Sequence, residues 1–190
     1  MLLRRALLLS KQVPKTVPIP LLSSFTASNG ALPSVNSGCS LTASGLYIPS
    51  GGFVEYRISD LCPKDFKKIT LSLDMKYTKT AYAHGWFVFF ESKGRIGIDK
   101  NVIPRDRFRL FDIMTQQPVP LGTWLHVKIV ADFSLGVSTI PQCEIVDIET
   151  VPSGFVAIAK PSRLVLGTNV MSDELDGWEG YVKNVKITFD

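Results

Sequence analysis

The chain has 190 residues, of which 45% are hydrophobic and 20% charged, so it can form one domain with a full core and does not have a disordered composition. Its formal net charge of +4 arises at the N-terminus, because four of the 21 Lys and Arg residues precede the first acidic residue, Glu55. The other 17 balance the 17 Asp and Glu residues, and this neutral body argues against a domain built to bind duplex nucleic acid.

Residues 1–15 form a basic, acid-free segment that begins MLLRRALLLSKQV. Its apolar and Arg-bearing positions make an imperfect amphipathic helix, which is typical of a mitochondrial presequence. The run Leu7–Leu9 is too short for a secretory signal of the usual kind, and no run of about twenty apolar residues predicts a transmembrane helix. We expect a mitochondrial location, with secretion as the alternative.

Residues 16–36 are rich in Pro and Ser, and they predict an extended linker. Pro18 and Pro20 disfavour a helix, while Leu21, Leu22 and Phe25 are too apolar for a fully solvated segment. These three side chains are expected to lie along the domain or against a partner.

From residue 37 to residue 190 the dominant hydrophobic period is two, which predicts strands. In 69–77 every second residue from Ile69 to Tyr77 is apolar, and 124–133 alternates in the same way from Leu125 to Phe133. Shorter strands are expected at 45–49, 52–58, 86–91, 95–99, 107–112, 142–149, 155–158 and 163–167. No helical period is found beyond the N-terminus. Many short strands separated by Gly- and Pro-containing turns predict an all-β sandwich or barrel.

Four segments resemble the concanavalin A-like and laminin G-like jelly-roll superfamily: 37–56, 67–78, 120–133 and 163–190. The third carries a Gly-x-Trp-x-x-Val pattern with Trp124 and Val127 in the matching places. The fourth resembles the family's closing hairpin, in which the step from Val182 to Val185 predicts a β-bulge at Lys183-Asn184. The resemblance implies a jelly-roll sandwich of two antiparallel sheets over 37–190, in a superfamily that includes lectins, glycanases and adhesion modules.

Glycanases of this fold carry three acids on one strand face, and the chain offers only Glu144, Asp147 and Glu149. In a regular strand Asp147 and Glu149 share a face while Glu144 points the other way. His126 is expected to be an outward cross-strand residue, and no nucleophile with a neighbouring base is recognised. We therefore expect no enzymatic activity.

A second candidate site is the acidic loop MSDELDGWEG, which combines carboxylates with a Trp. Calcium takes six to eight oxygen ligands, and the loop could supply some of them. A solvated loop is the simpler interpretation, and no other cofactor is expected. The candidate ligand or calcium residues are Asn169, Asp173, Glu174, Asp176 and Trp178.

A third candidate site is a basic cluster in 93–109, which includes Lys93 and Arg95. Arg105, Arg107 and Arg109 alternate with other residues, so three guanidinium groups could line one strand face. Such a strip suits an acidic protein surface, phosphate or RNA. An ordinary solvated strand face is the alternative.

The cysteines and histidines argue against a structural zinc site, because the chain has no CxxC pair and only two histidines. Cys39, Cys62 and Cys143 are far apart and odd in number. Reduced, partly buried thiols are expected, with one disulfide and a leftover thiol as the alternative.

Together these patterns favour a non-catalytic accessory subunit of a mitochondrial multiprotein complex, such as the respiratory chain, the ATP synthase or the mitoribosome. The jelly roll would then be a protein-docking scaffold whose partners are other subunits, with RNA contact not favoured. The alternative is a carbohydrate-binding or adhesion module, with or without calcium.

Overall fold

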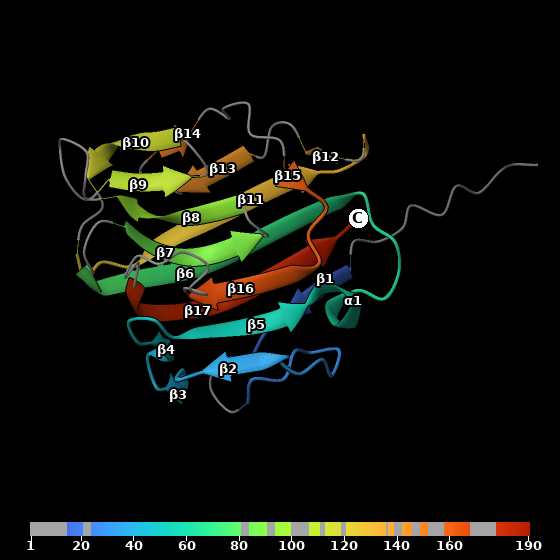
Figure 1. Ribbon diagram of the computed structural model, residues 1–190, viewed down its shortest axis with the longest axis horizontal. Helices are drawn as coiled ribbons and strands as arrows, with labels where there is room; N and C mark the ends of the chain where they lie inside the picture. The colour runs from blue at the N-terminus through green and yellow to red at the C-terminus, as the bar shows by residue number, and fades with distance from the viewer. Residues whose placement is uncertain are drawn as a thin grey trace, which may run out of the picture.

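The computed structural model describes residues 15–20, 24–80, 84–90, 94–99, 107–110, 113–118, 121–135, 137–138, 142–145, 149–151, 158–167 and 178–190. These residues form an all-β sandwich of two antiparallel sheets, which confirms the predicted fold class (Figure 1). Side chains are described for 15–20, 24–78, 121–135, 160–167 and 179–190. No helix within the described ranges is long and apolar enough to span a membrane.

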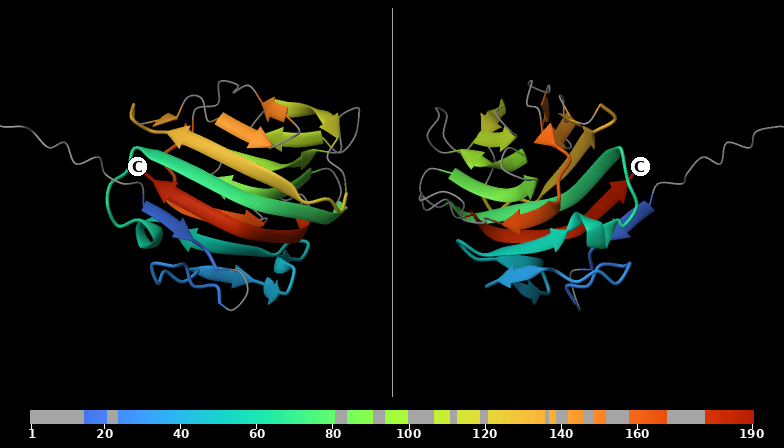
Figure 2. Two further views of the ribbon diagram at one scale, coloured as in Figure 1. Left: turned by 180° about the vertical axis from the view of Figure 1, so that it is seen from behind. Right: turned by 45° about the vertical axis from the view of Figure 1, so that its right-hand side comes forward.

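The first sheet, called here the β6 sheet, is the layer nearest the viewer on the left of Figure 2. Its strands are, in spatial order, β14 (Glu149–Val151), β13 (Gln142–Ile145), β11 (Leu125–Asp132), β6 (Lys68–Thr80), β17 (Trp178–Phe189), β4 (Gly45–Ile48) and β3 (Ser40–Thr42), with β1 (Lys15–Pro18) also paired to β17.

The second sheet, called here the β7 sheet, faces the β6 sheet across the core. Beyond the two sheets, β12 (Val137–Ser138) pairs with β15 (Ile158–Ala159), and a single turn of helix, α1 (Ile58–Leu61), follows the strand β5. The expectation of no helix after the N-terminus missed this turn, which is too short to show a period. The strands of the β7 sheet are, in order, β10 (Ile113–Pro118), β9 (Arg107–Leu110), β8 (Gly94–Asp99), β7 (His84–Phe90), β16 (Arg163–Gly167), β5 (Phe53–Arg57) and β2 (Val35–Ser37).

The core lies between the sheets, and the two strongest alternating patterns supply its centre. The predicted inward residues of β6 and β11 are buried, whereas the intervening polar residues lie on the solvent side. Burial of alternate apolar side chains fixes the register, since a shift by one residue would expose the whole apolar set. The buried residues are Ile69, Leu71, Leu73, Met75 and Tyr77 of β6, and Leu125, Val127, Ile129 and Ala131 of β11, followed by Phe133.

The predicted bulge in β17 is confirmed. The register of β17 against β6 shifts between Lys183 and Lys186, and Asn184 has φ 52°. Asn is among the few residues with a Cβ that adopt this left-handed conformation readily. The bulge lets both Val182 and Val185 point into the core although they are three residues apart.

The predicted closing hairpin is wrong. β16 pairs with β5 and β7 in one sheet, while β17 pairs with β6 and β4 in the other. Two consecutive strands that belong to different sheets form no hydrogen bonds with each other. The local sequence pattern is the same for such a crossover as for a hairpin, so it does not distinguish the two. The single strand expected at 142–149 is likewise two antiparallel strands, β13 and β14.

The structure also differs from the expected domain boundary at residue 37. β1 pairs with the end of β17, from Lys15 opposite Phe189 to Pro18 opposite Lys186, and Val17 and Ile19 are buried in the core. The start of the expected linker is extended, as predicted, but its alternate apolar residues Val17 and Ile19 pack into the core beside β17. Pro18 is tolerated because β1 is an edge strand.

The segment that follows β1 is held in place by Tyr56. Its hydroxyl donates a hydrogen bond of 2.6 Å to the carbonyl oxygen of Phe25, and burial raises the pKa of this phenol. Phe25 packs against the core and Ala27 is buried. Of the three apolar residues expected to contact the domain, Phe25 does so, and Leu21 and Leu22 lie outside the described residues.

Two of the three cysteines are free and buried, as expected. Burial raises the pKa of the Cys39 thiol to about 12, so this thiol is protonated at neutral pH. Cys143 lies in β13, but its side chain is outside the described residues.

The role of β1 predicts a contrast between two of its positions. Val17→Ala should lower the free energy of unfolding by about 2 kcal/mol, because it removes apolar atoms from a packed core. Lys15→Ala, at an exposed position of the same strand, should change it by less than about 0.5 kcal/mol. Urea unfolding measures both, and equal effects would show that β1 is not part of the folded core.

Candidate functional site

The predicted basic cluster is only partly within the described residues. Arg95 lies in β8, while Arg107 and Arg109 lie in β9, opposite Asp99 and Gly97 respectively. Positions two apart on a strand share a face, so the backbone is compatible with an Arg strip. Lys93 and Arg105 lie outside the described residues, as do the three Arg side chains, so anion binding here stays a prediction.

The predicted calcium loop also stays a prediction. Asn169, Asp173, Glu174 and Asp176 lie outside the described residues, and Trp178 is the first residue of β17, opposite Thr80. The described part of the chain holds no group of three or more His, Cys, Asp or Glu residues that could bind a metal ion.

The three acids considered for glycanase chemistry do not form one row. Glu149 is opposite Ile145 on the neighbouring strand, so these two side chains share a face of the sheet. Glu144, which is opposite Thr150, is the residue before Ile145 and has the other orientation. Asp147 lies outside the described residues. The backbone therefore places Glu144 and Glu149 on different faces of the sheet.

A site that the sequence did not reveal lies on the outer face of the β6 sheet. The register places Tyr47 of β4 opposite Tyr181 of β17, and Tyr181 opposite Lys76 of β6. Trp124, just before β11, continues this row because Leu125 is opposite Met75. We call Tyr47, Tyr181, Lys76 and Trp124 the aromatic strip. All four side chains are half-buried, so each keeps part of its surface in solvent.

The strip is held together by contacts among its rings and two ammonium groups. The rings of Tyr47 and Tyr181 are 5.3 Å apart between centroids, at an interplanar angle of 48°. Lys76 Nζ lies 4.9 Å from the ring centroids of both Tyr181 and Trp124. Lys183 Nζ lies 4.0 Å from that of Trp124. These are cation–π contacts, each worth about 0.5–1 kcal/mol at an exposed site.

A polar row adjoins the strip and is centred on Asp74. One carboxylate oxygen lies 2.7 Å from Nδ1 of His126, and the other accepts a hydrogen bond of 2.6 Å from the amide of Asn184. His126 is the outward cross-strand residue that the sequence predicted, with 44% of its side chain exposed. Since Asn184 is the bulge residue, Asp74 links the bulge to β6 and β11.

Glu179 closes the other end of the strip. Its Oε1 accepts a hydrogen bond of 3.2 Å from the hydroxyl of Tyr47. Desolvation raises the pKa of Tyr47, and the hydrogen bond and negative charge of Glu179 raise it further, so this phenol is a stable donor. The residue between Glu179 and Tyr181 is Gly180, where a Cβ would overlap the backbone of Lys76 and Tyr77. The glycine thus permits the close approach of β17 to β6.

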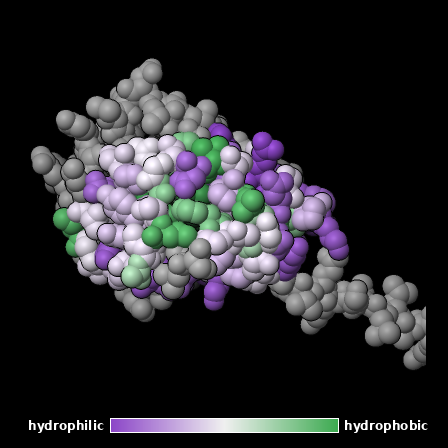
Figure 3. All heavy atoms as spheres, turned by 90° about the horizontal axis from the view of Figure 1, so that it is seen from below, coloured by the Kyte–Doolittle hydropathy of each residue, from purple (hydrophilic) through white to green (hydrophobic). Residues whose placement is uncertain are grey.

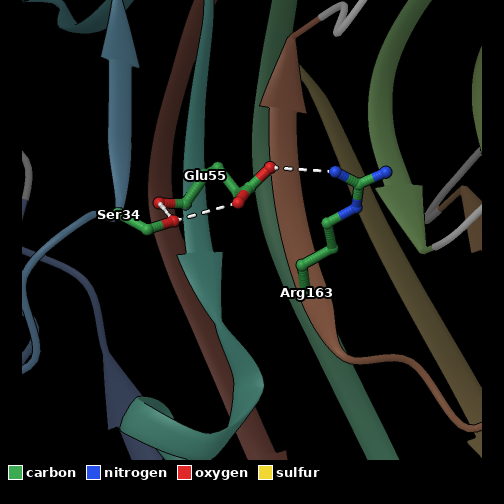
Figure 4. A network of polar contacts seen from close by, with 3 residues as sticks. All are labelled: Ser34, Glu55 and Arg163. Atoms are coloured by element: carbon green, nitrogen blue, oxygen red, sulfur yellow. Dashed lines mark hydrogen bonds and ion pairs between the residues drawn. The ribbon is translucent and has the colours of Figure 1, made fainter. Parts of the chain in front are cut away.

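The outer face of the β7 sheet carries a different kind of polar cluster (Figure 4). Arg163 NH1 lies 3.2 Å from Glu55 Oε2, and the hydroxyl of Ser34 donates a hydrogen bond of 3.0 Å to Glu55 Oε1. Only 25% of the Arg163 side chain and 15% of the Glu55 side chain are exposed. These residues join β5 to β16 and to the residue before β2, so the cluster is best explained as a structural link.

The aromatic strip escaped the sequence analysis because its members come from four separate segments. Trp124 was noted only as part of the family-like pattern, and Tyr47 and Tyr181 are single outward aromatics in otherwise ordinary strands. The one signal in the sequence was that Tyr47, Tyr181 and Trp124 each stand where the alternating pattern predicts a residue that faces solvent. Only the register shows that they are neighbours.

Comparison with known proteins identifies the fold. No protein-family model matches the sequence, and no curated protein matches it. Among solved structures, the chain is similar to Trypanosoma rangeli sialidase in complex with difluorosialic acid, with TM-score 0.61 and 12% identity over 90% of this chain and 29% of the sialidase. It therefore spans less than a third of that protein.

Two further structures are similar over most of this chain. One is domain 4 of an extracellular arabinanase from Geobacillus stearothermophilus, in complex with arabinotriose, with TM-score 0.58, 13% identity and coverage of 92% of this chain and 94% of that domain. The other is botulinum neurotoxin type C, described as dependent on two ganglioside molecules for cell entry, with TM-score 0.57, 12% identity and coverage of 92% and 47%. The fold is thus the concanavalin A-like jelly roll that the sequence resemblance implied.

The central place of Asp74 predicts a measurable cost for its removal. Asp74→Ala should lower the free energy of unfolding by about 1–3 kcal/mol, because it leaves Asn184 and His126 without their shared acceptor. Asp60→Ala, at an exposed position in α1, is the control and should change it by less than about 0.5 kcal/mol. Chemical denaturation at neutral pH compares the two, and a neutral Asp74→Ala would contradict the proposed link.

Proposed function

We propose that this chain is a non-catalytic carbohydrate-binding module that binds sugar on the outer face of its β6 sheet. The observation that carries the proposal is the aromatic strip, in which the half-buried residues Tyr47, Tyr181 and Trp124 lie in one row across the sheet.

Aromatic rings suit sugars because a pyranose has one face lined by C–H groups. These weakly positive groups pack against the negative face of an aromatic ring and release water from both surfaces. Ligand sites in general combine such apolar surface with a few well-placed polar groups. Here Thr78, Glu179, His126 and Asp74 lie at the margins of the strip and could hydrogen-bond sugar hydroxyls.

The rigidity of the strip also supports sugar binding. Its residues are on paired strands of one sheet, and Glu179 fixes the Tyr47 hydroxyl while Asp74 fixes the neighbouring bulge. Preformed side chains lose little conformational freedom when a ligand binds. The arabinanase domain is in complex with arabinotriose and the neurotoxin interacts with ganglioside molecules, and the shared fold supports the same class of ligand for this chain.

Removing the largest ring of the strip tests the proposal. Trp124→Ala should weaken binding to any glycan recognised by the wild-type chain at least about tenfold, since an aromatic anchor at the centre of a binding site contributes about 2 kcal/mol or more. Phe53→Ala is the matched control, because Phe53 is a half-buried aromatic on the outer face of the other sheet. A broad glycan panel followed by calorimetry provides the measurement. A wild-type chain that binds no glycan, or equal loss in both variants, would contradict the proposal.

A second candidate function is the accessory subunit of a mitochondrial assembly, and the end of the sandwich that carries β2 and β3 favours it. β2 is a three-residue edge strand with every side chain exposed, and large hydrophobic residues nearby face solvent, with Leu32 63% and Val35 40% exposed. Figure 3 shows hydrophobic residues grouped among polar ones on this end. Exposed apolar groups beside an unpaired strand edge are suited to contact another protein chain.

The subunit candidate predicts migration with a large organellar assembly after gentle native extraction. The double variant Leu32→Ser and Val35→Ser should release the chain from that assembly without unfolding it, because both side chains are already exposed. Leu135→Ser is the control, since Leu135 is 89% exposed outside this surface. Migration of the wild-type chain as a free particle of its own 21.0 kDa would exclude this function.

A further inference from the structure

Two lysines converge on one indole ring within the aromatic strip. Lys183 Nζ lies 4.0 Å and Lys76 Nζ 4.9 Å from the centroid of Trp124, and Lys76 also lies 4.9 Å from the centroid of Tyr181. The two ammonium groups reach the ring from adjacent strands, β17 and β6. Both side chains are half-buried, so neither is a fully solvated surface lysine.

The acids near these lysines are engaged by other groups. Asp74 is opposite Lys183 in the strand register, yet its two oxygens contact His126 and Asn184. Glu179 accepts the hydrogen bond of Tyr47. Among the residues with described side chains, none forms an ion pair with Lys76 or Lys183, whose recorded partners are aromatic rings alone. Within the described side chains, the positive charge of the strip therefore has no carboxylate counter-ion.

We infer that the strip is selective for anionic glycans, in which a sugar ring carries a carboxylate or a sulfate group; this inference rests on the proposed carbohydrate-binding function. A sugar that packs on Trp124 takes the place of the two ammonium groups over the ring, so the cation–π contacts are lost. An anionic substituent then accepts charge-assisted hydrogen bonds from Lys76 and Lys183 at the margin of the ring. A neutral sugar offers only hydroxyl groups, which compensate less for the displaced charges.

The charge around the strip favours a single anionic group over a polyanionic surface. Asp74 lies two residues from Lys76 along β6, and Glu179 lies four residues from Lys183 along β17, so carboxylates are interspersed with these two lysines. A nucleic acid or an anionic membrane is bound by many positive charges spread over a face. Two ammonium groups beside a single aromatic ring instead form a site large enough for one sugar ring with one anionic group.

Matched pairs of ligands test this inference with the full chain. We suggest sialyllactose against lactose, trigalacturonic acid against its methyl ester, and sulfated lactose against lactose. The wild-type chain should bind at least one anionic member ten or more times more tightly than its neutral counterpart. The three pairs also distinguish carboxylate from sulfate as the preferred group. Raising the salt concentration should reduce this preference, because an exposed ion pair is screened.

The double variant Lys76→Gln and Lys183→Gln should reduce the preference to threefold or less while binding of the neutral member is kept or improved. The double variant Lys128→Gln and Lys186→Gln is the matched control, since it removes the same charge from exposed positions of the same sheet and should keep the preference. Thermal unfolding of each variant verifies the fold.

The outcomes separate this inference from the proposed function. If Trp124→Ala abolishes binding but the wild-type chain binds both members of every pair equally, carbohydrate binding stands and anionic selectivity is wrong. Selectivity that survives in Lys76→Gln and Lys183→Gln also overturns the assignment to these lysines. If the wild-type chain binds no member of any pair or of the broader panel, both proposals fall.

Discussion

The bulge at Asn184 is the constraint on which most of this structure depends. Strand β17 must place Val182 before the bulge and Val185 after it in the same core. In a regular strand, residues three apart point to opposite faces, so the apolar side chains of one half would face solvent. The left-handed conformation of Asn184 resolves this conflict with one extra residue. Both halves of β17 then pair with β6 along its length.

The same bulge organises the neighbours of β17. The half before it pairs with β4, from Gly180 opposite Ile48 to Val182 opposite Leu46, whereas the half after it pairs with β1. It also brings Lys183 and Asn184 to adjacent outward positions, where one reaches Trp124 and the other binds Asp74. A single local irregularity thus supports the core, the N-terminal strand and the aromatic strip.

The sequence predicted those features of the fold that depend on local pattern. The alternation from Ile69 to Tyr77 and from Leu125 to Phe133 identified the central strands and their buried faces, and the Val182–Val185 spacing identified the bulge. Sheet membership is not local, which is why β16 and β17 were expected to form a hairpin although they lie in different sheets. β1 was missed because a four-residue strand with a proline resembles a linker.

The candidate site was less predictable than the fold for the same physical reason. His126 was expected to point outward and does so, but its partner Asp74 lies 52 residues away in the chain. The strip joins residues whose proximity is set by the pairing of β4, β17, β6 and β11, and no spacing in the sequence encodes it. Charge clusters are easier to see in a sequence, and the two that were noted, at 93–109 and 169–178, remain predictions.

Mapping the bound ligand by nuclear magnetic resonance is the most direct test of the central claim that the outer face of the β6 sheet binds sugar. An isotope-labelled chain would be titrated with an oligosaccharide selected from a glycan panel. We predict that the largest chemical-shift changes occur at the Trp124 indole N–H and at the backbone amides of Tyr181 and Lys76. Changes confined to β8 and β9 or to residues 169–176, with the strip unaffected, would contradict the claim.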